Sequence, residues 1–170
     1  MFVLFLLSAL GLVVSLGIHL CTFLPGYSVE VEKSLLPQLF LCFFPLFFVA
    51  AKCANNDARR YGYKKGSNWC VPPDAPQWLI PANKMVLLYW IVNFALLMIH
   101  SGHDGDPKIQ GGKYVMERDG TITKEITREE YHQRVAHEAR GISGHLLSLY
   151  FFTAVPFFLR YRRPKLPTPT

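Results

Sequence analysis

The fold is decided by uninterrupted apolar stretches such as MFVLFLLSALGLVVSLGIHLCTFL, residues 1–24, in which no Asp, Glu, Lys or Arg occurs. This charge-free run continues to residue 29, and three more lie between Lys33 and Lys52, Lys84 and Asp104, and Arg140 and Arg160. Together they make up half of the chain, and all formal charges lie in the other half. The pattern excludes a water-soluble globule, a disordered chain and a disulfide-rich secreted module.

The length of the four apolar runs predicts the fold class. A helix needs about 20 apolar residues to cross a hydrocarbon layer about 30 Å thick, and each run reaches about that length. We therefore expect an all-α membrane protein, with residues 1–170 forming one domain of four transmembrane helices. The expected spans are about 3–24, 34–51, 85–101 and 143–159. The first is expected to be an uncleaved span, because it lacks a basic leader region and a cleavage site of small residues.

The distribution of basic residues predicts the topology. Lys and Arg collect in the 52–84 loop and in the tail from Arg160, and cytoplasmic loops of membrane proteins show this excess. We therefore expect an inner-membrane protein with both termini cytoplasmic and with segments 25–34 and 103–140 outside. The net charge of +6 then needs no nucleic-acid partner. Contact with anionic lipid is an expectation for four residues of the inner loop: Arg59, Arg60, Lys64 and Lys65.

The outer segment, residues 103–142, carries its own structural signals. Asp119-Gly120 separates two β-prone stretches, 113–118 and 121–126, and predicts a hairpin. Thr127-Arg128-Glu129-Glu130 is a capping box, which predicts the start of an amphipathic helix. The apolar stripe of this helix is expected at Tyr131, Val135 and Ile142. The helix should lead into the fourth span, with a bend at Gly141 or Gly144.

Small and polar residues within the spans predict helix contacts. Gly11 and Gly17, with Ser8 and Ser15, would allow a neighbouring helix to approach closely. Asn93 lies inside the third span, where an amide normally forms a hydrogen bond to another helix. Pro45 should kink the second span, because proline removes a backbone donor.

The region of about residues 76–150 resembles a family of small bacterial multi-pass membrane proteins whose function is uncharacterised. The resemblance is carried by Trp78, Asn93-Phe94, Lys113-Tyr114, Asp119-Gly120, Glu130-Tyr131 and Arg140-Gly141-Ile142-Ser143-Gly144-His145. It departs from the family at Leu146, where we expect an aromatic residue. The resemblance implies a bacterial membrane protein and implies no chemistry.

Histidines are the only candidates for chemistry, and three of the predicted spans place one near the outer side. His100 and His145 are the best matched in depth and could hold a b-type haem between them, with His19 somewhat deeper. The segment 100–106 also offers imidazoles and carboxylates to a divalent metal. The favoured interpretation assigns no cofactor or metal: these are interfacial or hydrogen-bonding histidines.

The expected function is that of a non-catalytic accessory or interaction subunit of a larger membrane assembly. Its partners would be the lipid bilayer and other membrane proteins, or further copies of the chain. The sequence contains no nucleophile motif and no phosphate-binding loop, which argues against an enzyme. The alternative is a small membrane redox protein that binds haem or a metal through His100, His145 or His19.

Overall fold

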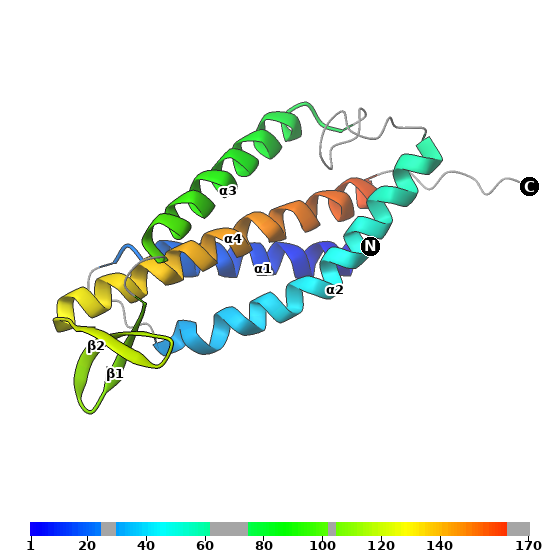
Figure 1. Ribbon diagram of the computed structural model, residues 1–170. Helices are drawn as coiled ribbons and strands as arrows, with labels where there is room; N and C mark the ends of the chain where they lie inside the picture. Colours follow the sequence, from blue (N-terminus) through cyan, green and yellow to red (C-terminus); the bar gives the residue numbers. More distant parts are fainter. Residues whose placement is uncertain (25–29, 62–74, 102–104, 163–170) are drawn as a thin grey trace, which may run out of the picture.

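The architecture is a bundle of long helices with a small β-sheet at one end (Figure 1). The computed structural model describes residues 1–24, 30–61, 75–101 and 105–162. The elements in chain order are α1 (Phe2–Cys21), α2 (Glu30–Tyr61), α3 (Leu79–Ser101), β1 (Asp106–Gln110), β2 (Lys113–Arg118), β3 (Thr121–Glu125) and α4 (Arg128–Arg162). Successive helices run in alternate directions, so that α1 and α3 end, and α2 and α4 begin, at the end that carries the sheet, here called the sheet end.

Each of the four predicted spans overlaps a helix that is long and apolar enough to cross a membrane. The first, expected to reach residue 24, ends at Cys21, whereas the other three helices are longer than the predicted spans. The helix expected at about 34–51 begins at Glu30 and ends at Tyr61, and the one expected from residue 85 begins at Leu79. Charge-free windows locate the part of a helix that tolerates lipid, whereas backbone hydrogen bonding continues into the charged flanks. Pro37 and Pro45 both lie inside α2.

α4 is the central helix of the bundle, since it packs against each of the other three. At 35 residues it is about 52 Å long, well beyond the hydrocarbon thickness. The amphipathic helix and the fourth span are therefore one helix, without an interruption at Gly141 or Gly144. The predicted stripe is correct at Tyr131 and Val135 but wrong at Ile142, which is 40% exposed. The buried position is Ala139, because burial continues in steps of four residues.

The contact between α1 and α4 uses the small residues of α1. Ser8 and Ser15 are fully buried, and Gly11 lies against the ring of Tyr150 so closely that a Cβ atom would clash. The Tyr150 hydroxyl donates to the carbonyl oxygen of Leu39 on α2 over 2.7 Å and thereby joins three helices. The predicted close approach is confirmed at Gly11, but at Gly17 nothing lies within 4 Å of the position that a Cβ atom would occupy.

The sheet has three antiparallel strands in the order β1-β2-β3, where a two-stranded hairpin was expected. The predicted turn at Asp119-Gly120 is confirmed, with φ angles of 51° and 80°. The missed strand, β1, is joined to β2 by a second two-residue turn, Gly111-Gly112, with φ angles of 58° and 76°. Gly-Gly permits the positive φ angles of this turn type as well as Asp-Gly does, so the signal was present in the sequence.

The sheet is attached to the first turns of α4. The rings of Tyr114 on β2 and Tyr131 on α4 lie 5.1 Å apart, and Val115 and Met116 of β2 are buried. The predicted capping box forms: the Thr127 backbone N–H donates to the Glu130 carboxylate over 2.9 Å, and the Glu130 backbone N–H donates to the Thr127 hydroxyl over 3.1 Å. The sheet and the start of α4 thus form one unit at the sheet end.

Candidate functional site

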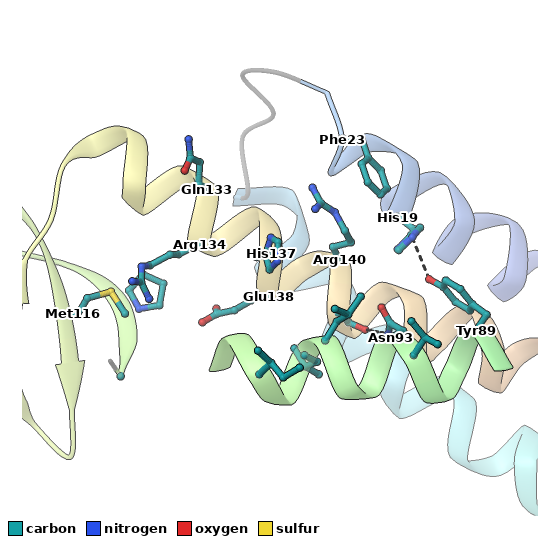
Figure 2. Close-up of a pocket in the computed structure, with 17 residues that line it drawn as sticks. His19, Phe23, Tyr89, Asn93, Met116, Gln133, Arg134, His137, Glu138 and Arg140 are labelled. Carbon is teal, nitrogen blue, oxygen red and sulfur yellow. Dashed lines mark hydrogen bonds between the residues drawn. The ribbon is translucent and has the colours of Figure 1, made fainter. Parts of the chain in front are cut away.

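Polar side chains of three helices meet inside the bundle toward the sheet end. We call the five residues the histidine cluster: His19 on α1, Tyr89 and Asn93 on α3, and Ser143 and His145 on α4. His19 joins all three helices, because its Nδ1 lies 3.2 Å from the Ser143 hydroxyl and its Nε2 lies 3.1 Å from the Tyr89 hydroxyl. Figure 2 shows the second of these contacts. The cluster therefore ties α1 and α3 to the central helix.

Asn93 makes the direct connection between α3 and α4. Its Nδ2 donates to the Gly141 carbonyl oxygen over 2.8 Å and lies 2.8 Å from Nδ1 of His145. The amide group has two hydrogens, so it can serve both acceptors. Gly144 makes this approach possible, since a Cβ there would lie 2.5 Å from the Tyr89 hydroxyl and 2.8 Å from the Asn93 amide. The prediction that Asn93 forms a hydrogen bond to another helix is confirmed.

His145 joins the cluster through its contact with Asn93. Its ring packs edge-on against Trp90 and Phe94, with centroid distances of 6.1 Å and 5.6 Å. Its Nε2 is buried and has no hydrogen-bond partner among the described residues, and the same holds for Nε1 of Trp90. Nδ1 also lies 2.9 Å from the carbonyl oxygen of Gly141, so the contacts are compatible with either tautomer. When Nδ1 accepts from Asn93, Nε2 carries the proton of a neutral imidazole and is a buried donor; when Nδ1 donates to Gly141, Nε2 holds a lone pair.

Arg140 lies one turn before the cluster on α4 and closes the end of α1. Its Nη2 donates to the Thr22 carbonyl oxygen over 2.9 Å, and its Nε donates to the Thr22 hydroxyl over 3.2 Å. The guanidinium group also lies 4.1 Å from the centroid of the Phe23 ring, which is within range of a cation–π interaction. Three contacts thus hold this arginine at the sheet end of the bundle.

A cavity of about 750 Å³ extends from the histidine cluster toward the sheet (Figure 2). His19, Tyr89 and Asn93 lie at one end, and Met116 of β2 lies at the other. One wall is α4, which contributes charged and polar side chains: Gln133, Arg134, His137, Glu138 and Arg140. The opposite wall is α3, which contributes apolar ones: Val92, Leu96, Leu97 and Ile99. The cavity is therefore apolar on one side and polar on the other.

The structure describes the side chains of two of the three histidines proposed from the sequence, His19 and His145. His145 packs at the level of Trp90 and Phe94, whereas His100 follows Asn93 by about 10 Å along the axis of α3. Among the described side chains it is His19 that joins the same cluster as His145, and the pairing of His100 with His145 stays a prediction. The side chain of His100, and His103 and Asp104, lie outside the described residues.

The other candidate sites differ in how far the structure describes them. No group of three His, Cys, Asp or Glu side chains suited to a metal ion occurs in the described part of the chain. Arg59 and Arg60 lie in the last turn of α2, at the end of the bundle opposite the sheet. Lys64 and Lys65, the other two predicted lipid contacts, lie outside the described ranges.

Sequence reasoning missed Tyr89, Ser143 and the role of Arg140. One signal was available: Tyr89 and Asn93 are four residues apart, so that both polar side chains lie on one face of an otherwise apolar helix. No signal pointed to the contact of Arg140 with Thr22, because the two residues are 118 positions apart.

Comparisons with known proteins identify no relative of this chain. The sequence matches no protein-family profile, and no curated protein and no solved structure is significantly similar to it. The resemblance of residues 76–150 to a family of small bacterial membrane proteins stays a prediction.

Proposed function

We propose that this chain is a multi-pass protein of the bacterial inner membrane, with the sheet end outside and both termini in the cytoplasm. The arrangement of charge supports this orientation. Arg59, Arg60, Arg160 and Arg162 lie in the last turns of α2 and α4, at the end opposite the sheet. Basic residues accumulate on the cytoplasmic side of membrane proteins.

Cysteine labelling tests this orientation. In a chain whose other cysteines, Cys21, Cys42 and Cys53, are replaced by Ala, an impermeant maleimide should label Cys70 only after the membrane is opened. A single cysteine placed at Ile122 on β3 should react in intact cells. Labelling of Cys70 from outside would reverse the topology, and extraction of the chain by carbonate without detergent would refute membrane insertion.

We further propose that the chain acts as a non-catalytic accessory subunit that binds another membrane protein through the sheet. The observation that supports this role is β3: all five of its residues are exposed, and it forms an outer edge of the sheet. An edge strand presents unpaired backbone N–H and C=O groups to a strand of another protein. Ile122 on β3 is 48% exposed beside this edge, so the partner strand would offer an apolar side chain to it.

Site-specific photo-crosslinking tests the accessory role in intact membranes. A crosslinking residue at Ile122 should give one discrete adduct, whose mass identifies a partner of different sequence. The same residue at Glu129, which is exposed on α4, is the matched control and should give none. An adduct of twice the chain mass would assign the edge to a homo-oligomer, and no adduct at Ile122 would refute the docking edge.

One observation favours the alternative, a small membrane redox protein. The buried Nε2 of His145 is free of hydrogen bonds among the described residues, and a haem or metal ligand must leave one ring nitrogen free in this way. This proposal expects a difference spectrum with a Soret band that sharpens on reduction and is lost in His145→Leu. If protein incubated with haemin in mild detergent shows a featureless spectrum after unbound haemin is removed by gel filtration, the haem proposal is refuted.

A further inference from the structure

The cavity between α3, α4 and the sheet has the chemistry of a ligand site. Its volume of about 750 Å³ lies in the usual range for small-molecule sites, about 300–1,000 Å³. We propose that it binds one anionic membrane lipid, with the headgroup phosphate at Arg140 and an acyl chain along α3. The proposal rests on the membrane location proposed above and does not depend on the accessory role.

The charges of the cavity wall favour an anion. Two guanidinium groups, Arg134 and Arg140, line it against one carboxylate, Glu138, among the described residues. Arg140 is already oriented, because Thr22 accepts two of its hydrogen bonds and Phe23 lies under its guanidinium plane. A guanidinium group has several N–H donors in a planar fork that matches phosphate oxygens, so Arg140 keeps donors for a ligand while it holds α1.

The opposite wall favours a hydrocarbon chain rather than a free ion. Val92, Leu96 and Ile99 of α3 line the cavity and are 48%, 50% and 68% exposed. They lie in the half of α3 nearer the sheet end, within the segment that is apolar enough to cross a membrane. In the proposed orientation this wall faces the outer leaflet, so that a lipid can enter sideways with its chain against α3 and its headgroup toward the sheet. Basic pockets between membrane helices bind lipid headgroups in this way.

A lipid also fits the position of the cavity along the bundle. The histidine cluster closes its inner end, and Pro107 and Met116 of the sheet line its outer end. Arg140 lies between these ends, at the last turn of α1, where the apolar part of the bundle gives way to the sheet. A phosphate held there would lie at the boundary between hydrocarbon and water, which is where lipid headgroups reside.

Native mass spectrometry of the full chain in detergent tests the proposal. Titration with dioleoylphosphatidylglycerol should give one tightly bound lipid per chain. Leu96→Trp fills the apolar wall and should weaken this binding about tenfold, whereas Leu88→Trp, at an exposed position on α3 outside the cavity, should not. Arg140→Gln should also weaken it about tenfold, whereas Arg128→Gln, at the exposed start of α4, should leave it unchanged.

Three outcomes would overturn the proposal. Unchanged lipid binding in Leu96→Trp would exclude the cavity even if Arg140→Gln proved too unstable to purify. Equal binding of dioleoylphosphatidylcholine would exclude selection for an anionic lipid. Displacement by inorganic phosphate at equal concentration would reassign the site to a free anion. A chain that never enters the membrane would refute the location itself, whereas an inserted chain without bound lipid would refute this site alone.

Discussion

Arg140 on α4 donates from Nη2 to the carbonyl oxygen of Thr22, the residue that ends α1, over 2.9 Å. The last carbonyl groups of a helix have no partner within the helix, and a cation near them also interacts favourably with the helix dipole. The guanidinium group also lies over the ring of Phe23, the next residue along the chain. A single side chain of the central helix therefore satisfies the end of the first helix and forms part of the cavity wall.

Replacing Arg140 should loosen the end of α1. Arg140→Gln removes the charge and the planar fork, and we expect a loss of about 2 kcal/mol in the free energy of unfolding, typical of a hydrogen bond to a charged group. Arg140→Lys keeps the charge but replaces the two donor nitrogens of the planar fork, Nε and Nη2, by a single nitrogen, so it should rescue only part of this loss. Amide hydrogen exchange at Cys21 to Phe23 in detergent measures the effect. Equal protection in Arg140→Lys and the unmodified chain would contradict the role of the fork.

Glycine-to-alanine changes should have opposite effects at two positions. At Gly144 an added Cβ would meet Tyr89 and Asn93, so overpacking of about 1–3 kcal/mol should exceed the helix-propensity gain of about 1 kcal/mol and lower the melting temperature. At Gly17 nothing lies within 4 Å of an added Cβ, so Gly17→Ala should leave the melting temperature unchanged or raise it. Thermal melting of both variants and the unmodified chain in the same detergent compares their melting temperatures. A lower melting temperature for Gly17→Ala alone would contradict the packing described.

The hydrogen bonds of Asn93 should couple α3 to α4. Asn93→Leu removes the donor to Gly141 and to His145, and we expect a loss of about 0.6–2 kcal/mol, the range for such bonds between membrane helices. A double-mutant cycle with His145→Phe isolates the pair, and reversible unfolding in mixed micelles measures it. Additive losses would show that Asn93 and His145 do not interact.

The capping box should make the start of α4 sensitive to acid. The hydrogen bond from the Thr127 backbone N–H lowers the pKa of the Glu130 carboxyl, so the charged carboxylate stabilises the folded form. This contribution is complete above the ordinary glutamate pKa and is lost as the pH falls through the lowered pKa. Hydrogen exchange in the first turn of α4 should therefore increase on acidification, beyond the intrinsic pH dependence of exchange.

Three variants test whether the acid sensitivity comes from the capping box. Thr127→Ala should destabilise the first turn by about 1 kcal/mol, because it removes the hydroxyl that accepts from Glu130, whereas Thr127→Ser keeps that hydroxyl. In Glu130→Gln the acid-dependent increase should disappear. Persistence of the increase in Glu130→Gln would assign it to another group.

Composition and short-range patterns were sufficient to predict the local structure. Long charge-free runs can bury their backbone polar groups in lipid only as helices, and turn and cap signals act within a few residues. The four helices, the Asp119-Gly120 turn and the Thr127 capping box followed from them. The missed strand β1 could also have been predicted from a short-range pattern, since Gly111-Gly112 is itself a turn signal.

The site was decided by tertiary structure, because its contacts join residues that no pattern relates. His19 meets Ser143 across 124 positions, and Arg140 meets Thr22 across 118. The depth of each histidine along its own span favoured His100 as the partner of His145 and did not reveal the cluster that includes His19, because depth alone does not say how far one helix is offset along another. That offset depends on where Gly144 lets Tyr89 and Asn93 approach, and such packing is set by the shapes of both helices together.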